Sequence, residues 1–329
     1  MSSAKKRVMW LDICKGFAIF APIIMHTYGP TFKIAIVACS LFPMFFFTSG
    51  YTIKKPESLS QLGKATLKDL RFILLPALLV YMLQGVYYGF VSEYGTMFWH
   101  IFDMVKVFFT NSNPGMMWFF WALFWSKLCY RIYLMVVKKY QIFPLLILTL
   151  IGYKISNIYR SPMLLDVIPI CMLFLHIGAS VKKLESYENV KKLAYIGLPV
   201  LTIVWAYLSF VKTYYIDISG RDYNLYTVVQ SACILYMCTA FAKLIENNII
   251  GKPFIIWGQH TLGMIFLHFL DGIWLTPIKN VIENTIGISN NTTHFIIRMT
   301  FITAGTFLCI FIKNLVLKGF NKLFKSRHS

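Results

Sequence analysis

The sequence predicts an all-α integral membrane protein in which about ten transmembrane helices form a single domain, residues 1–329. Composition is the first reason: 57% of the 329 residues are hydrophobic and 14% are charged, whereas about a quarter of the residues in a soluble domain are charged. The mean hydropathy of +0.63 agrees with this class. The second reason is that apolar runs of about 20 residues, the length that crosses a bilayer, recur along the chain.

Ten apolar runs are candidate spans, and the fifth of them is short. They lie near residues 9–29, 34–53, 72–91, 117–137, 142–158, 162–181, 193–211, 224–245, 252–273 and 295–317. The first run is not a cleaved signal peptide, because Asp12 and Lys15 interrupt it and no small-residue cleavage site follows. The longest predicted external connections, near 92–116 and 274–294, are either solvated connectors or segments that line or cover a site.

The net charge of +19 is distributed unevenly along the chain. Lys and Arg gather at both ends and in the even-numbered connections, of which the segment 54–71 is the richest, while the odd-numbered connections are poorer in cations. Cytoplasmic connections carry such an excess, so both termini are predicted to be cytoplasmic, which agrees with an even number of spans. Membrane lipids account for the positive charge, and no nucleic-acid partner is predicted.

The cysteines predict neither a disulfide framework nor a metal centre. They lie in or beside the apolar runs, no pair has the spacing of metal ligands, and their number is odd. We interpret them as packing residues and predict no metal cofactor. The seven are Cys14, Cys39, Cys129, Cys171, Cys233, Cys238 and Cys309.

Two ionisable residues, Lys15 and His26, lie inside the first apolar run. Such residues are costly within a membrane, so they are candidates for a functional site. Eleven helical positions correspond to about three turns, which places both side chains on one face about 16 Å apart. This geometry predicts a ligand that extends through much of the bilayer. Two alternatives stay open: Lys15 forms a structural pair with Asp12, and His26 reaches the membrane interface.

Five local patterns occur in a characteristic order along the chain. The first has a basic residue and a glycine before a histidine, the second is rich in Phe and ends in Ser-Gly-Tyr, and the third places two cations before Leu-Pro. The fourth is rich in Trp and Phe, and the fifth has Gly and Thr-Leu before a histidine. They are LDICKG at 11–16 with His26, FPMFFFTSGY at 42–51, KDLR at 68–71 with LP at 75–76, WFFWALF at 118–124, and WGQHTL at 257–262 with His268.

Together these patterns resemble the membrane-bound acyltransferase 3 family from residue 8 to about 270, and most strongly its fucose 4-O-acetylase-like and cell-surface polysaccharide O-acetyltransferase branch. The resemblance implies a multi-pass protein of the bacterial plasma membrane. Such a protein moves an acetyl or similar small acyl group from cytoplasmic acyl-CoA, with acetyl-CoA as donor, to a hydroxyl of a cell-surface carbohydrate or its lipid-linked precursor. Lys15 and Lys68 stand where many members have Arg, and Lys lacks the bidentate fork of a guanidinium.

Acyl transfer from a thioester to a hydroxyl needs a base, because neutral alcohols are poor nucleophiles, and a histidine can accept that proton at neutral pH. His26 is the predicted catalytic base. The predicted donor-binding residues are Lys15, Lys68 and Arg71, whose cations suit the phosphates of CoA. The predicted substrate-binding residues are Ser49, Tyr51, Trp118 and His268.

Structural roles compete with several of these predictions. Lys68 and Arg71 are also explained as positive-inside charge, Ser49 as a small residue at a helix contact, and Trp118 as part of an aromatic belt. Three carboxylates in the chain are candidates to orient an imidazole, but the sequence does not pair them with a histidine. These are Asp166, Asp217 and Asp271.

Two other classes of function fit the same features. A transporter or flippase for a lipid-linked glycan would also have many helices and buried charges, but the paired repeats and interrupted helices common in transporters are not evident in the sequence. A signalling protein with a vestigial acyltransferase fold is the second alternative, which the two Arg-to-Lys departures keep open. Transfer of label from acetyl-CoA distinguishes these classes from an enzyme.

Overall fold

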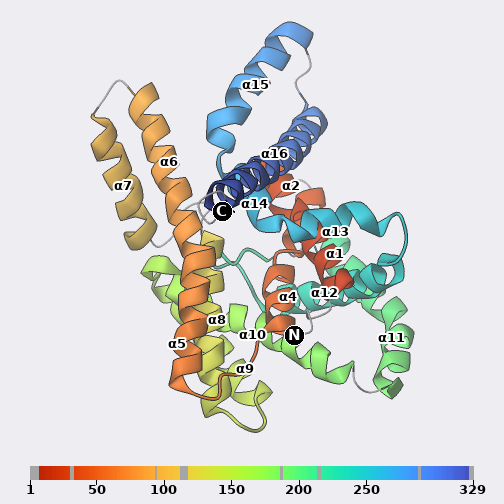
Figure 1. Ribbon diagram of the computed structural model, residues 1–329. Coiled ribbons are helices and arrows are strands. Elements are labelled where there is room, and N and C mark those ends of the chain that lie inside the picture. Colours follow the sequence, from red (N-terminus) through yellow and green to blue (C-terminus); the bar gives the residue numbers. More distant parts are fainter. Residues whose placement is uncertain are drawn as a thin grey trace.

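The structure is a computed structural model that describes residues 7–29, 33–92, 95–111, 118–185, 188–212, 216–287 and 290–325. Within these ranges the chain is helical, and the only β-type pairing is an isolated bridge between Asp217 and Asp222. The all-α class predicted from composition is confirmed. Figure 1 shows the helices packed around a central group that includes α1, α4, α10 and α12.

The helices differ widely in length. In chain order they are α1 (Met9–Ala18), α2 (Phe20–Tyr28), α3 (Lys33–Cys39), α4 (Met44–Thr52), α5 (Leu59–Asp69), α6 (Leu75–Val91), α7 (Met97–Thr110), α8 (Trp118–Val136), α9 (Ile142–Ile158), α10 (Ile168–Leu184), α11 (Glu188–Ala206), α12 (Leu225–Ile245), α13 (Gly251–Gln259), α14 (Thr261–Phe269), α15 (Asp271–Ile286) and α16 (Asn291–Lys325). Two π-helical turns, η1 (Leu70–Leu74) and η4 (Tyr207–Val211), and one 3₁₀ turn, η3 (Pro162–Val167), join some of them.

Five helical segments in the described ranges are long and apolar enough to cross a membrane. They are Met9–Tyr28, Leu59–Val91, Pro162–Leu184, Leu225–Ile245 and Asn291–Leu315. A sixth is counted if Thr261–Phe269 and Ile273–Thr285, which are bent by 66°, form one broken span. The predicted number of about ten spans and the predicted cytoplasmic termini are therefore not confirmed, while a multi-pass membrane protein is supported.

Several predicted spans are divided or short in the structure. The run 34–53 is split between α3 and α4 by turns at residues 40–43. The helices Ile142–Ile158 and Gly197–Val211 are apolar but shorter than a full span. The two segments predicted as long connections, 92–116 and 274–294, contain α7 and most of α15. They are therefore largely helical instead of extended loops, and α7 packs against α6 as a hairpin (Figure 1).

The first span is interrupted between α1 and α2 at Ile19, although Met9–Tyr28 still counts as one helical segment. Pro22 explains the position of this break, because proline has no N–H to donate to the carbonyl of Ala18 and its ring crowds that carbonyl. The amide of Ile19 still donates to Lys15 O at 3.1 Å, so the chain continues in nearly the same direction. The prediction that Lys15 and His26 share one helix face assumed an unbroken helix, and the interruption at Ile19 lies between these two residues.

Glycines allow two helix pairs to approach closely. A Cβ built on Gly258 would lie 1.7 Å from Asp12 O, so α13 and α1 pack backbone against backbone. A Cβ on Gly50 would lie 1.9 Å from Leu175 O, where α4 meets α10. Small residues serve this purpose in membrane helices, where close van der Waals contact drives association. The close helix contact in this part of α4 is therefore made by Gly50, the residue after Ser49.

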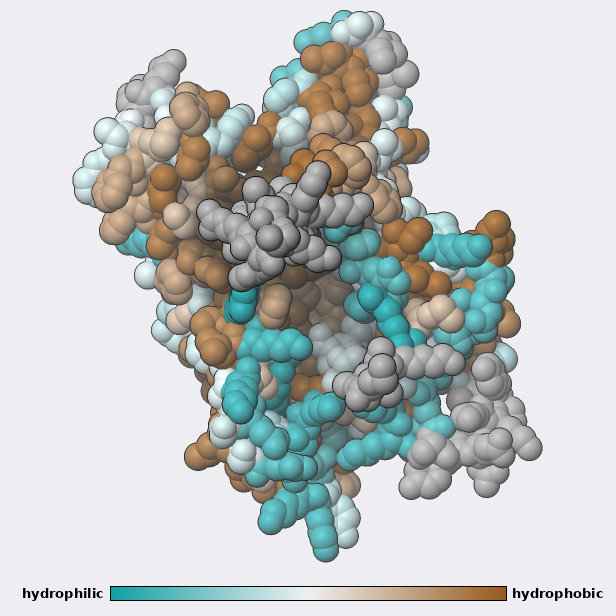
Figure 2. Space-filling view, viewed as in Figure 1, coloured by the Kyte–Doolittle hydropathy of each residue, from teal (hydrophilic) through white to brown (hydrophobic). Residues whose placement is uncertain are grey.

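The surface is divided between apolar and polar regions. Figure 2 shows hydrophobic residues over α6, α7 and α15 in its upper part and hydrophilic residues gathered in its lower part. On α6, Leu79, Leu83 and Phe90 are exposed. Exposed contiguous apolar surface of this kind is unfavourable in water and is expected where lipid covers a protein.

Candidate active site

His26 and His268 lie beside each other although 242 positions separate them in the sequence. Their ring centroids are 5.1 Å apart and the rings are inclined by 44°. His26 projects from α2 and is exposed, whereas His268 on α14 is completely buried. The structure thus brings together the predicted catalytic base and one of the predicted substrate-binding residues, and only one of the two is accessible.

A carboxylate and a guanidinium extend this pair. Asp271, at the start of α15, places Oδ2 2.9 Å from His268 Nδ1. Arg298 on α16 places Nε 3.0 Å from the same oxygen. The side chain of Asp271 is 7% exposed and that of Arg298 is 13% exposed, so both charges are largely removed from water and each compensates the other.

Arg298 also contacts the helix that carries His26. Its Nη1 donates a hydrogen bond of 2.7 Å to Thr27 Oγ1, and the Thr27 hydroxyl donates in turn to Ile23 O at 2.7 Å. Sequence reasoning did not select Arg298. The signal was present, because a lone arginine inside the predicted last span, 295–317, is an intramembrane charge that needs a partner.

The structure also resolves which of the three candidate carboxylates accompanies a histidine. Asp271 does, as described. Asp166 pairs instead with Arg221, whose Nε lies 2.8 Å from Oδ2. Asp217 accepts hydrogen bonds within its own turn, from residues 219 and 220.

A small cavity of about 20 Å³ adjoins His26. Its volume is close to that of a single water probe, so an acyl group or a sugar enters only if aromatic side chains move. Trp118 is one of the lining residues, which places it beside His26. The cavity is lined by Pro22, His26, Phe42, Phe45, Trp118, Phe119, Ile265 and Phe269.

Lys15 has an acidic partner. Its Nζ donates to Asp12 Oδ1 at 2.7 Å, and Arg7 Nε lies 2.5 Å from the other oxygen of the same carboxylate. The structural pair that was the alternative for Lys15 is therefore present. The Lys15 side chain is still 31% exposed, so an anionic ligand can approach it.

Lys68 and Arg71 are both exposed, at the end of α5 and in η1. In the described part of the chain neither forms an ion pair with a carboxylate. The residue between them, Asp69, turns inward and accepts hydrogen bonds of 2.5 Å from Lys127 and from Arg131 on α8. The two predicted donor-binding cations thus stay accessible while their acidic neighbour holds α5 to α8.

Tyr51 lies in the last turn of α4. Its hydroxyl donates to Glu185 Oε2 at 2.6 Å, and its ring meets that of Trp10 edge to face with centroids 5.0 Å apart. Glu185 also pairs with Lys243. Phe45 lines the cavity at His26, and Tyr51 follows it by six positions, about 9 Å along the helix axis. Ser49 lies between them and is half-buried.

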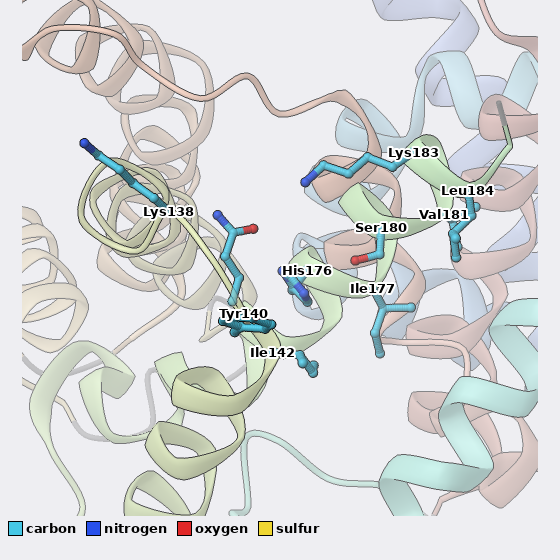
Figure 3. A pocket seen from close by; sticks show the side chains of 10 residues that line it. Lys138, Tyr140, Ile142, His176, Ile177, Ser180, Val181, Lys183 and Leu184 are labelled. Carbon is cyan, nitrogen blue, oxygen red and sulfur yellow. The ribbon is translucent and has the colours of Figure 1, made fainter. Parts of the chain in front are cut away.

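Two larger hollows lie away from His26 and His268. One, of about 570 Å³, separates the α8–α9 connection from α10. Figure 3 shows Lys183 extending toward His176 in this cleft, with Lys138 on the opposite side pointing away. His176 Nδ1 is 3.0 Å from the hydroxyl of Tyr130. The other hollow, of about 590 Å³, is an apolar groove along α12.

In the ranges that the structure describes, no group of three or more His, Cys, Asp or Glu side chains is arranged as a metal site would require. The lack of a metal cofactor remains a prediction.

A known protein family matches nearly the whole chain. The acyltransferase domain that defines the acyltransferase 3 family matches residues 8–315, a range that contains His26, His268, Asp271 and Arg298. Neither a curated protein nor a solved structure matches the chain. Because the family match covers nearly the whole sequence and the helices are apolar and long, the chain belongs to the acyltransferase 3 family of membrane acyltransferases.

Proposed function

We propose that this protein is an O-acyltransferase of the bacterial cell membrane. It transfers an acetyl or similar small acyl group from cytoplasmic acyl-CoA to a hydroxyl of a cell-surface carbohydrate or its lipid-linked precursor. The observation that carries the proposal is the accessible His26 beside the buried His268, in a chain that belongs to a family of membrane acyltransferases.

His26 acts as the general base. It accepts the proton of the acceptor hydroxyl as the hydroxyl oxygen attacks the thioester carbonyl carbon. The carbon–sulfur bond then breaks, and the sulfur of CoA leaves as a thiol after receiving the proton from the imidazolium. The exposure of His26 supports this assignment over His268, because a base must come within hydrogen-bond distance of the substrate proton.

Donor binding is assigned to Lys15, Lys68 and Arg71. Their cations pair with the phosphates of CoA, since charge-assisted hydrogen bonds to phosphate are stronger than neutral ones. Support comes from the exposure of Lys68 and Arg71 and from the remaining exposure of Lys15.

The remaining assigned residues divide between acceptor and donor. Trp118 packs against the acceptor sugar beside His26, and its place in the cavity lining supports that role. Ser49 and Tyr51 follow Phe45 along α4, away from the cavity, and this supports a role along the path of the donor. His268 is assigned to the substrate site because its ring lies beside that of His26.

The test is acyl transfer by the purified full-length protein in lipid nanodiscs. Radiolabelled acetyl-CoA is supplied with membrane glycan extract, and free CoA thiol and labelled glycan are measured. His26→Ala is expected to lower transfer by about 10²–10⁴-fold, as the loss of a general base does, with unchanged size-exclusion behaviour. His260→Ala, at the junction of α13 and α14, is the matched control.

Retention of more than about a tenth of transfer by His26→Ala would sink the assignment of the base, given the usual size of that effect. Release of no thiol by the wild-type protein, together with binding or translocation of a lipid-linked glycan, would instead support the transporter interpretation.

A further inference from the structure

We infer that Arg298 is a positioning residue of the acyl-transfer site, which ties the Asp271–His268 pair to the helix that carries His26. The inference rests on the proposed function. It concerns a residue that does not touch the substrate, because its contacts are with Asp271 and Thr27.

The guanidinium contacts two helices with two different nitrogens. Nε lies 3.0 Å from Asp271 Oδ2 on α15, and Nη1 donates to Thr27 Oγ1 on α2 at 2.7 Å. These nitrogens belong to one rigid plane, so the positions of Asp271 and Thr27 are set relative to each other. Thr27 directly follows His26 in the sequence. A lysine has the same charge but no planar fork, and it would not impose this geometry.

The same contacts place the imidazole of His268 between Asp271 and His26. Its Nδ1 lies 2.9 Å from Asp271 Oδ2, but neither nitrogen of the ring makes a hydrogen bond with the described residues. The second ring nitrogen, Nε2, is buried on the side away from that contact. That nitrogen is left to interact with His26 or with a hydroxyl bound beside it.

The attachment of α15 and α16 does not depend on Arg298 alone. Trp274 stacks on Phe301 with ring centroids 4.6 Å apart, and His294 Nε2 lies 3.2 Å from Glu283 Oε1. A change at Arg298 should therefore disturb the histidines more than the fold. Glu283 supplies the matched control, since its carboxylate contacts His294 between the same two helices but away from His268.

The experiment compares four variants of the full-length protein in nanodiscs: Arg298→Gln, Arg298→Lys, the double variant Asp271→Asn/Arg298→Gln, and the control Glu283→Gln. Three quantities are measured: kcat and KM for acetyl-CoA, the melting temperature, and the rate of diethyl pyrocarbonate modification of His268 by peptide mapping. The modification rate does not depend on activity, so it tests the positioning role of Arg298 even if acyl transfer is absent.

Arg298→Gln is expected to lower kcat by roughly 10- to 100-fold, the effect of a small misplacement of catalytic groups, with little change in KM. It should also lower the melting temperature, because Asp271 is left as an unpaired buried charge. The double variant removes that charge, so its melting temperature should recover while kcat stays low and His268 is modified faster than in the wild type. Arg298→Lys should keep most of the stability, because the charge remains, but its kcat should fall. Glu283→Gln should change kcat by no more than about twofold, because partly exposed pairs contribute little.

A double variant that regains kcat together with its melting temperature would show that Arg298 is only a structural partner of Asp271. Wild-type kcat in Arg298→Lys would overturn the inference too, because charge alone would then suffice. Unchanged modification of His268 in a double variant with recovered stability would also overturn it, because His268 would then hold its position without the guanidinium. Absence of acyl transfer in the wild-type protein would refute the proposed function and leave the modification rates to decide the role of Arg298.

Discussion

At the scale of single residues, cations divide into those with a carboxylate partner and those without one. The chain has 32 Lys and Arg against 13 Asp and Glu, so cations outnumber the carboxylates that could pair with them. The buried arginines have carboxylate partners, as Arg221 has Asp166 and Arg131 has Asp69. A buried charge without a partner is strongly destabilising, whereas an exposed one is solvated. Lys68 and Arg71 are exposed and have no carboxylate partner among the described residues, so they are available to a ligand.

This availability predicts the behaviour of the double variant Lys68→Ala/Arg71→Ala. Its KM for acetyl-CoA should rise by roughly tenfold or more, since each charge-assisted hydrogen bond contributes about 1.5–3 kcal/mol. Lys68→Arg should keep donor binding or improve it, because the guanidinium adds the bidentate fork. Steady-state kinetics with varied acetyl-CoA measure the effect.

The control for that pair is Lys55→Ala/Lys64→Ala, which removes the same charge from exposed positions of the same basic segment. An equal rise of KM in both double variants would mean that the cations act only through net charge. An unchanged KM in both double variants would mean that Lys68 and Arg71 do not bind the donor and serve only as cytoplasmic charges that set the membrane topology.

At the scale of the helices, close backbone contacts decide where the site residues lie. The α1–α13 contact has no room for a side chain at Gly258, and α13 leads directly into α14, which carries His268. The α4–α10 contact is built in the same way at Gly50. Because lipid supplies little hydrophobic drive between helices, such contacts depend on van der Waals fit. They are therefore sensitive to a single methyl group.

Gly258→Ala is expected to destabilise the protein, because the new Cβ would meet the carbonyl oxygen of Asp12 at 1.7 Å and a backbone must shift. Overpacking of this kind costs about 1–3 kcal/mol or more. Gly63→Ala is the matched control: it lies in α5 with nothing within 4 Å of the added Cβ, and helix propensity should raise stability by up to about 1 kcal/mol. Melting temperatures in detergent measure both, and a Gly258→Ala protein as stable as the Gly63→Ala protein would contradict the packing argument.

At the scale of the whole molecule, the site exists only when four helices meet. His26, His268, Asp271 and Arg298 come from α2, α14, α15 and α16. The predicted topology puts the basic segment 54–71 in the cytoplasm and His26 toward the other membrane surface. The acyl group would then have to cross much of the bilayer to meet its acceptor, which follows from the position of CoA in the cytoplasm.

Cysteine labelling of intact cells tests that topology. In a background without the seven native cysteines, Ser60→Cys should react with a membrane-impermeant maleimide only after the cells are opened. Thr96→Cys, which follows the opposite end of the Leu59–Val91 segment and is exposed, should react in intact cells. Labelling of position 60 from outside would overturn the predicted orientation.

The sequence alone was sufficient for the class and the family. Apolar content and the length of apolar runs are local properties, and they predicted a helical membrane protein that the fold supports. The motifs around His26 and His268 are short and contiguous, so the family resemblance was visible in them and the family match confirms it. Trp118 and His26 line the same cavity, and a role for Trp118 in substrate binding stays a prediction.

Only the tertiary structure decided which charges meet. Asp271 lies three positions after His268 and was named without a partner, while Arg298 was missed altogether. Their pairing depends on how α15 and α16 pack against α2, and no local pattern encodes a contact between residues 27 and 298. Helix breaks divide some of the predicted spans. Pro22 marks one of these breaks in the sequence itself. No such local signal was used to place the turns at 40–43 or the bend after α14, which the structure reveals.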